Sequence, residues 1–332
     1  HNPLSIAITG MGGVFPQATD PVELWNVVRE GRHTSSTIPE SRWPVSPESV
    51  LHSGEAVRDR TRSIRACLID SLDFDPGAYG LSVDLITRLD PVFHLTLMAG
   101  HAAWQDQRGK LPDSQRTGVI LGNIALPTET LSRMVHDLSE PAIRELVTGV
   151  EPAQKPDSKH HPLNCYPVGL PACLLARSLD LGGGWQTIDA ACASSLYALK
   201  LAIIELVHGR LDAVITGGVG RPDSMYTQMG FSQLRAVSPT GVCAPFDSNA
   251  NGLVVGEGAG VFVLRRLEDA IAGGDRIHGV IRGIGLSNDT GGSLFAPDSA
   301  GQVRAIRKAY EQAGWNPGEV DLVECHGTGT PV

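Results

Sequence analysis

The sequence lacks the long apolar run that a membrane helix needs. No stretch of its 332 residues approaches the roughly 18 consecutive apolar side chains of a spanning segment. The first residues, from His1 to Leu4, also lack the charged and apolar regions of a secretory signal. A reducing, cytoplasmic setting without a membrane span is therefore expected.

Positive charge is sparse and scattered. The chain has 27 Lys and Arg against 36 Asp and Glu, a formal net charge of -9, and no basic stripe. This pattern excludes the electrostatic footprint of a nucleic-acid-binding domain. It leaves room for an acidic protein partner, because a local basic patch is enough to attract one.

Metal-binding and nucleotide-binding patterns are missing too. The six cysteines form no C-x-x-C pair and match no zinc spacing, and the pair His160-His161 has no third ligand at a useful distance. The glycine-rich segment 10–15 has Phe15 where a dinucleotide fingerprint needs Gly or Ala, and segment 256–260 is followed by no Lys-Ser or Lys-Thr. Most cysteines, including Cys325, are expected in the core.

The composition is that of a globular protein with a sizeable core. Hydrophobic residues make up 42% of the chain and charged residues 19%. The length allows one large domain or two fused halves. The 38 glycines predict many turns and close backbone approaches.

Segments typical of strands and helices alternate nearly throughout. Asp20 precedes Pro21 as a helix N-cap, and Pro91 stands at the first turn of another helix. The alternation predicts an α/β protein with helices layered around a mostly parallel sheet. The expected strands are 4–9 (ended by Gly10), 118–121, 185–188, 212–216, 260–264, 277–286 and 320–324, and the expected helices are 21–29, 90–105, 128–138, 171–178, 191–207, 267–272 and 299–313.

Cys192 stands among small residues between a predicted strand and a predicted helix, in the segment 187–196 (TIDAACASSL). A tight turn there would expose the thiol above the sheet. The helix N-terminus offers partial positive charge and unpaired N–H groups, which favour the thiolate that attacks thioesters. This pattern alone supports a nucleophile and a small buried cysteine about equally. Ser194 and Ser195 have no local base and are expected to support the helix start.

His326 follows the last predicted strand in the segment 326–330 (HGTGT). Open α/β sheets build their sites at the carboxyl ends of strands. Gly327 and Gly329 let a ligand approach the backbone, and Thr328 and Thr330 offer hydroxyls to an amide-rich ligand. A lone histidine after a strand is more often structural, but the Gly-Thr-Gly-Thr tail is not typical of a generic loop.

These segments together resemble the β-ketoacyl synthases, the condensing enzymes of fatty-acid and polyketide assembly. The most specific matches are 189–195 (DAACASS) and 326–330 (HGTGT), and the resemblance covers almost all of the chain. Segments 6–12, 244–247 and 256–260 also match. Phe15-Pro16, Leu24-Trp25, Ile38-Pro39 and Arg42-Trp43 are similar to the start of the family and to the synthase domains of type I multidomain polyketide or polyunsaturated-fatty-acid assembly lines.

The resemblance implies a thiolase-like fold of duplicated α-β-α-β-α layers. Residues 1–250 would form the N-terminal half with the nucleophile, and residues 251–332 the start of the C-terminal half. The family's second catalytic histidine and its Gly-Phe-Gly segment are not found, which suggests that the chain is truncated after the first histidine motif. The second half is then incomplete, and the chain alone is expected to be inactive. Phe93-His94 and Asn251 also depart from the family pattern.

The resemblance also implies the chemistry. Cys192 would accept an acyl group from the phosphopantetheine arm of an acyl carrier protein, and its N–H would form half of an oxyanion hole. A malonyl-type extender would then lose carbon dioxide, and its enolate, stabilised by His326, would attack the Cys192 thioester. Thr328 and Thr330 would bind the pantetheine arm. Asp247 and Glu257 are expected to be structural neighbours of the site.

No bound cofactor or metal is expected, since phosphopantetheine arrives with the carrier protein. A homodimer through residues 186–189 and flanking synthase domains are implied by the family. Two alternatives remain. One is another thiolase-fold enzyme, either degradative or primed by coenzyme A, against which the type I features argue. The other is a module that loads acyl groups or binds carriers without condensing them.

Overall fold

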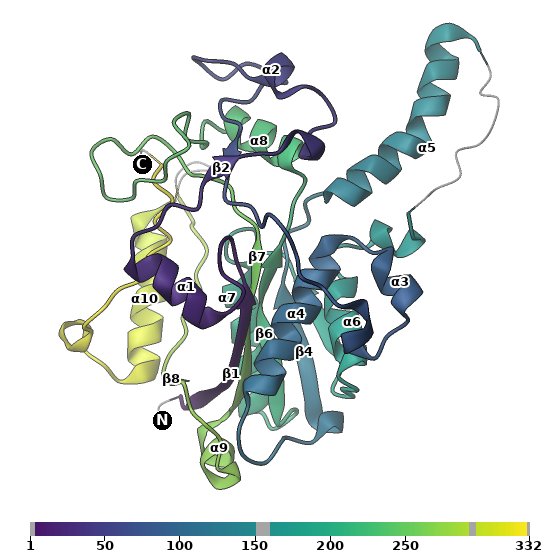
Figure 1. The fold of residues 1–332 in the computed structure, drawn as a ribbon. Helices are drawn as coiled ribbons and strands as arrows, with labels where there is room; N and C mark the ends of the chain where they lie inside the picture. Colours follow the sequence, from purple (N-terminus) through teal and green to yellow (C-terminus); the bar gives the residue numbers. More distant parts are fainter. Residues whose placement is uncertain (1–3, 151–159, 292–296, 331–332) are drawn as a thin grey trace.

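A computed structural model describes residues 4–150, 160–291 and 297–330 of the chain. Figure 1 shows a sheet flanked by helices. The strands are β1 (Ile6–Val14), β2 (Ser36–Thr37), β3 (Arg65–Ala66), β4 (Thr117–Gly122), β5 (Trp185–Ile188), β6 (Ala213–Gly220), β7 (Gly258–Arg266) and β8 (Gly279–Ile281). The α-helices are α1 (Pro21–Arg29), α2 (Pro47–Val50), α3 (Val83–Thr87), α4 (Pro91–Asp106), α5 (Glu129–Thr148), α6 (Leu170–Ser178), α7 (Ser194–Val207), α8 (Ser224–Gln233), α9 (Leu267–Gly273) and α10 (Ser299–Ala313). Short 3-10 helices are η1 (Glu40–Arg42), η2 (Pro76–Tyr79), η3 (Ser114–Arg116), η4 (Pro162–Cys165) and η5 (Pro317–Glu319).

Six of the strands form one mixed sheet in the order β5-β4-β6-β7-β1-β8. β4 runs parallel to β5 and β6, whereas the pairs β6–β7, β1–β7 and β1–β8 are antiparallel. The prediction of a mostly parallel sheet is therefore wrong. Alternating strands and helices do not fix strand direction: after β6 the chain passes through α8 and a long irregular segment, and it re-enters the sheet at the end where β6 left it, so β7 runs back along β6.

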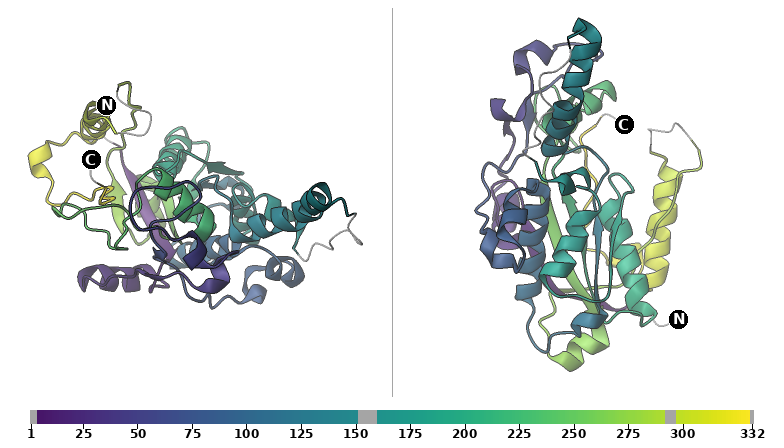
Figure 2. Two further views of the ribbon diagram at one scale, coloured as in Figure 1. Left: turned by 90° about the horizontal axis from the view of Figure 1, so that it is seen from above. Right: turned by 90° about the vertical axis from the view of Figure 1, so that its right-hand side faces the viewer.

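The sheet has a helical layer on each face. On one face, α4 and α6 bury Leu95, Ala99 and Leu175 against the side chains of Val119 and Val263. On the other face, α7 buries residues such as Ala202 and Leu206 against Ile120, Val214 and Leu264. Neighbouring residues of one strand thus serve opposite cores, as the two-residue period of a strand requires. Figure 2 shows α4 and α10 on opposite sides of the sheet.

Capping residues explain why several helices begin and end where predicted. The Asp20 carboxylate accepts hydrogen bonds from the N–H groups of Val22 and Glu23 at 2.7 and 2.8 Å, and α1 spans residues 21–29 as expected. α10 also has its predicted bounds. It begins after the N-cap Asp298 and ends at Gly314, whose φ of 70° suits glycine.

Phe93 and His94, which depart from the family pattern, both belong to helix α4. Asp90 caps the helix, as its carboxylate accepts the Val92 N–H at 2.9 Å. Phe93 is fully buried in the core beneath the helix. His94 stacks on the Phe74 ring, with ring centroids 4.1 Å apart, and its Nε2 lies 2.9 Å from the Ile86 carbonyl oxygen. Both departures therefore serve packing around α4.

Strand β1 is predicted to end at Gly10, but it continues to Val14 with a register shift between Ile8 and Gly10. Glycine is needed at these positions because the backbone of α4 packs directly against the backbone of β1. A β-carbon on Gly10 would lie 2.1 Å from the Ala103 carbonyl oxygen, and one on Gly12 would lie 2.2 Å from that of Ala99. The glycine-rich segment thus serves helix–sheet packing.

Two other element predictions need correction. The strand expected over 277–286 pairs only at Gly279–Ile281, beyond which the extended chain lies against α10 through Gly283 and Gly285. The strand expected over 320–324 is not formed, and Leu322 and Val323 are 82% and 70% exposed. A strand needs a hydrogen-bonded neighbour, which neither segment has among the described residues.

Helix α5 is longer than expected, reaching Thr148 although Pro141 lies inside it. The division of the chain at residue 250 stays a prediction. β7, which follows that point, lies between β6 and β1 in the same sheet. Residues from both sides of the expected boundary therefore share one core.

Candidate active site

Cys192 lies on a strained turn between β5 and α7. Its neighbour Ala191 has φ 50°, a left-handed conformation that is unusual for a residue with a β-carbon. The Asp189 carboxylate accepts the Ala191 N–H at 2.9 Å. The Ser194 hydroxyl accepts the Ala190 N–H at 2.9 Å and donates to the Ala191 carbonyl oxygen at 2.6 Å. The expected supporting role of Ser194 is thereby confirmed.

The first turn of α7 rests directly on the ends of two strands. A β-carbon on Gly122, the last residue of β4, would lie 2.5 Å from the backbone of Ser194 and Ser195. One on Gly218 of β6 would lie 3.0 Å from the Ser195 β-carbon. Because these positions are glycine, the helix start and Cys192 lie at the carboxyl edge of the parallel strands. The sequence contained this signal, but only the pairing of β4 with β6 explains it.

The Cys192 thiol is accessible. Cys192 is exposed, and its side chain makes no hydrogen bond within the part of the chain that the structure describes. The expectation that most cysteines are buried is wrong, since the exposed cysteines also include Cys165, Cys243 and Cys325. Cys325 is not in a strand, so the alternation that would turn it into the core does not apply.

The segment that contains His326 is supported by the loop before β7. The Gly252 N–H donates to the Gly329 carbonyl oxygen at 2.9 Å, and the Cys243 thiol lies 3.5 Å from the carbonyl oxygen of Thr328. Gly327 and Gly329 have φ values of 51° and 71°, which suit glycine. Two motifs that are far apart in the sequence, 244–247 and 326–330, also lie against each other, since a β-carbon on Gly327 would lie 3.6 Å from the Pro245 side chain.

The functional groups of this segment face outward or toward each other. His326 is exposed, and the hydroxyls of Thr328 and Thr330 lie 2.8 Å apart. A β-carbon on Gly329 would approach the Ala244 nitrogen at 3.2 Å, so its close neighbour is protein backbone. Among the described residues, no hydrogen bond or ion pair joins His326 to Cys192. The turn at Cys192 and the segment 326–330 are therefore held in place by separate sets of contacts.

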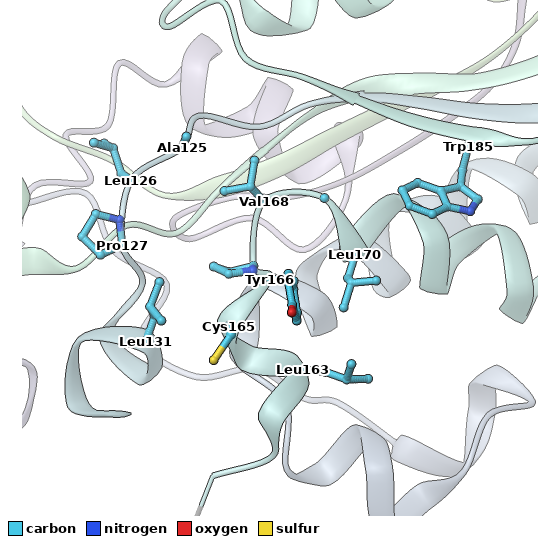
Figure 3. A pocket seen from close by; sticks show the side chains of 12 residues that line it. Ala125, Leu126, Pro127, Leu131, Leu163, Cys165, Tyr166, Val168, Leu170 and Trp185 are labelled. Atoms are coloured by element: carbon cyan, nitrogen blue, oxygen red, sulfur yellow. The ribbon is translucent and has the colours of Figure 1, made fainter. Parts of the chain in front are cut away.

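An apolar cavity of about 660 Å³ lies beside the nucleophile turn. Asp189 connects the two, because its carboxylate accepts the N–H of Ala125, a residue of the cavity wall, at 2.9 Å. Figure 3 shows Leu126, Pro127 and Leu131 on one side and Leu170 and Trp185 on the other, with Cys165 and Tyr166 between them. The lining residues are Ala125, Leu126, Pro127, Leu131, Leu163, Cys165, Tyr166, Pro167, Val168, Gly169, Leu170 and Trp185. Sequence reasoning missed this cavity because three separate parts of the chain form it, residues 125–131, residues 163–170 and Trp185.

A buried group of charges lies at the same end of the sheet. Arg42 forms ion pairs with Glu257 and Glu129, and Arg221 lies 3.6 and 3.7 Å from the same two carboxylates. Burial alone would lower the pKa of Arg42, but its hydrogen bonds to Glu257 and the charges of both glutamates outweigh burial and raise that pKa. The predicted structural role of Glu257 agrees with this geometry.

Asp247 is not part of this group of charges. Its carboxylate accepts the Asn249 N–H at 2.7 Å and holds a local turn.

Features of other site classes are absent among the described residues. No cluster of three or more His, Cys, Asp or Glu side chains there has the arrangement of a metal site. His161 serves a local purpose, since its Nδ1 accepts the Leu163 N–H at 3.2 Å and caps η4. No described helix is both long enough and apolar enough to cross a membrane.

Relatives of the chain occur in large synthases. It is 31% identical over 342 residues to a polyunsaturated fatty acid synthase subunit of Thraustochytrium sp., with 98% of this chain and 12% of that protein covered. It is 36% identical over 335 residues to a phenolphthiocerol/phthiocerol polyketide synthase subunit of Mycobacterium tuberculosis, with 98% and 16% covered. The chain thus spans a small part of the curated relatives that it matches.

Solved structures share the fold. A keto synthase–chain length factor, PfaC, superposes with a TM-score of 0.90 at 32% identity, covering 99% of this chain and 36% of that one. The ketosynthase from module 6 of the bacillaene synthase of Bacillus subtilis 168 gives a TM-score of 0.75 at 28% identity, covering 98% and 51%. The mixed α/β architecture is therefore that of ketosynthases.

Family models cover nearly the whole chain. The model described as β-ketoacyl synthase, N-terminal domain, matches residues 4–270, and that described as β-ketoacyl synthase, C-terminal domain, matches residues 278–332. The first match alone exceeds half of the chain and includes the turn at Cys192. The chain belongs to the β-ketoacyl synthase family and is related to the ketosynthase domains of polyketide and polyunsaturated-fatty-acid synthases.

Proposed function

We propose that the chain supplies the nucleophile half of a condensing site that extends acyl chains by decarboxylative Claisen condensation. The observation that carries this proposal is the exposed thiol of Cys192 on the left-handed turn at Ala191, at the start of α7. The partial positive charge and unpaired N–H groups of a helix N-terminus suit a reaction in which negative charge develops there. Membership of the family supports the reaction class.

In the first step, the Cys192 sulfur attacks the carbonyl carbon of an acyl thioester on the phosphopantetheine arm of an acyl carrier protein. A new carbon–sulfur bond forms, the bond to the pantetheine sulfur breaks, and the arm leaves as a thiol after taking up a proton. The N–H of Cys192 donates to the oxyanion of the tetrahedral intermediate. The arm is a substrate carrier and leaves with its protein, so no resident cofactor takes part.

In the second step, a malonyl-type extender on a carrier protein loses carbon dioxide. The electrons of the broken bond form an enolate, and His326 donates a hydrogen bond to its oxygen. The enolate carbon attacks the acyl carbon on Cys192, the carbon–sulfur bond breaks, and the thiolate is regenerated. Thr328 and Thr330 hold the pantetheine arm through their hydroxyls.

A second copy of the chain is the proposed partner along β5. This strand ends the sheet, since it pairs with β4 on one side only within the described residues. Trp185, which belongs to β5 and lines the apolar cavity, is 45% exposed. An edge strand with free N–H and C=O groups beside apolar surface favours pairing with a copy of itself.

The test of the first step is the intact mass of the protein after incubation with a short acyl-pantetheine thioester. We expect a gain of one acyl group in the natural full-length protein and none in Cys192→Ala. Cys325→Ala is the matched control, because Cys325 is also exposed. Equal labelling of wild type and Cys192→Ala would assign the thioester to another cysteine. Acyl transfer without carbon dioxide release from a malonyl thioester would favour an acyl-loading module over a condensing enzyme.

A further inference from the structure

The loop between α8 and β7 holds residues 326–330, which we call the histidine segment, by contacts from its two sides. On one side, the Cys243 thiol donates a hydrogen bond to the Thr328 carbonyl oxygen at 3.5 Å. On the other side, the Gly252 N–H donates to the Gly329 carbonyl oxygen at 2.9 Å. In Figure 1 the end of the chain runs beside this loop, which is drawn in green before β7. Within the described residues, every hydrogen bond from the rest of the chain to the histidine segment comes from this loop.

The sulfur of Cys243 packs closely against the histidine segment, although the residue is exposed to solvent. It also lies 3.8 Å from the Gly327 carbonyl oxygen. A β-carbon on Gly329 would lie 3.5 Å from this sulfur and 3.2 Å from the Ala244 nitrogen. The backbone directly after His326 is therefore seated on the loop, and no strand pairing holds it in the part of the chain that the structure describes.

A cluster of polar side chains joins the two sides of the loop. The Ser238 hydroxyl donates to Asn251 Oδ1 at 2.6 Å, and Asn251 Nδ2 donates to the Thr240 hydroxyl at 3.3 Å. Ser238 also accepts the N–H of Val242, the residue before Cys243, at 3.3 Å. Asn251 directly precedes the glycine whose N–H contacts the histidine segment. The cluster thus fixes the thiol and that N–H relative to each other.

We propose that Cys243 is a positioning residue for His326 in the decarboxylation step, and that Asn251 keeps the loop in the shape that this role requires. The inference rests on the proposed function, in which His326 donates to the enolate oxygen. Such a donor acts only at hydrogen-bond distance from that oxygen, so a shift of the backbone after His326 weakens it. The turn at Cys192 has its own hydrogen bonds, from residues 189–194. Loss of the Cys243 thiol therefore acts on carbon dioxide release and spares acyl transfer.

The experiment measures the two half-reactions separately in the natural full-length protein. One readout is the rate of acyl transfer from a short acyl-pantetheine thioester to Cys192, followed by intact mass. The other is the maximal rate and the half-saturating concentration for carbon dioxide release from malonyl-pantetheine by the acylated protein. Cys243→Ala removes the donor, and Cys243→Ser keeps a donor of similar size. Cys325→Ala is the matched control, because Cys325 is the exposed cysteine next to His326 and its thiol makes no hydrogen bond to any described residue.

We expect Cys243→Ala to lower the maximal rate of carbon dioxide release at least about fivefold, because a small misplacement of the donor costs much of its effect. The half-saturating concentration and the rate of acyl transfer should stay within twofold. Cys243→Ser should recover at least half of the unmodified rate, and Cys325→Ala should stay within twofold in both half-reactions.

Asn251 gives a second, independent pair of variants. Asn251→Ala should resemble Cys243→Ala, since it opens the polar cluster. Asn251→Asp should stay within twofold of the unmodified protein, because a carboxylate still accepts from Ser238 and can accept from the Thr240 hydroxyl.

Three results would overturn the positioning role. They are unchanged carbon dioxide release in Cys243→Ala, an equal fall of both half-reactions in that variant, and no recovery in Cys243→Ser. Absence of carbon dioxide release from the unmodified protein would instead overturn the proposed function.

Discussion

The guanidinium of Arg42 donates two hydrogen bonds to the carboxylate of Glu257, at 2.9 and 2.8 Å, although the residues are 215 positions apart. The side chains are 9% and 1% exposed. Glu257 also accepts the Ile69 N–H at 2.8 Å. One carboxylate therefore joins η1, the segment after β3 and the start of β7 at the end of the sheet where Cys192 lies.

Glu257→Gln is expected to destabilise the protein strongly. The amide has the shape of the carboxylate but not its charge, so it leaves Arg42 and Arg221 buried with one glutamate between them. Breaking a buried pair in this way costs about 3–5 kcal/mol. The measurement is the free energy of unfolding in urea. Glu140→Gln on α5 is the control, since its pair with Arg144 is exposed and is worth less than about 1 kcal/mol. Equal effects of the two substitutions would contradict the structural role of Glu257.

Gly122→Ala is expected to displace the start of α7. The new β-carbon would lie 2.5 Å from the Ser194 and Ser195 backbone, which cannot move away without shifting the helix. Overpacking of this kind costs about 1–3 kcal/mol. We expect a lower melting temperature and a changed rate of Cys192 alkylation by iodoacetamide. Gly230→Ala is the control, because a β-carbon on that α8 residue meets open space. If Cys192 in Gly122→Ala were alkylated at the wild-type rate, the contact at Gly122 would not position the thiol.

Asp212 is expected to make stability fall in acid. Hydrogen bonds from Arg116 and Arg266 lower the pKa of Asp212 from 3.8 to about 2. Since the folded pKa lies below the unfolded one, the stabilisation is fully present above 3.8 and is lost as the pH falls toward about 2. Asp212→Asn is expected to be less stable at neutral pH and to lose less stability across this acid range. The free energy of unfolding in urea is measured at several pH values, with Asp73→Asn as the surface control. Parallel stability curves for wild type and Asp212→Asn would show that Asp212 is not the source of the acid sensitivity.

His94 gives a second pH dependence at milder acidity. Burial lowers the pKa of His94 below 6.5, against the opposing effects of its bond to Ile86 and the charge of Asp90. The neutral ring is therefore the folded form, and its stabilisation is complete above the unfolded pKa and lost as the pH falls through the folded one. His94→Phe keeps the stacking on Phe74 and is expected to flatten the stability profile below 6.5. His33→Phe, at an exposed site, should leave the profile unchanged; a wild-type profile in His94→Phe would exclude His94 as the source.

Local chemistry made several parts of the fold predictable. An aspartate followed by proline sets the start of α1, and a glycine with positive φ sets the end of α10. The nucleophile turn is equally local, because Asp189, Ala191 and Ser194 are near neighbours in sequence and hold one another. Such features follow from the rules for caps and turns.

Features that depend on distant contacts escaped prediction. The glycines of β1 suggest the end of a strand in the sequence, but α4, some 90 residues later, requires them. The direction of β7 depends on the path of the chain between β6 and β7. The Arg42–Glu257 pair and the apolar cavity join segments that no sequence window contains. The roles of Cys192, His326, Thr328 and Thr330 stay predictions until the acylation experiments are done.

The turn at Ala191 links the direction of the thiol to the local opening of α7. The hydroxyl of Ser194, the first residue of α7, bridges the Ala190 N–H and the Ala191 carbonyl oxygen and so ties the left-handed backbone to the start of the helix. Fraying of that turn would release φ at Ala191 and redirect Cys192 without global unfolding. Exchange of the Ala190 amide hydrogen with solvent therefore reports how much of the time the nucleophile is correctly oriented.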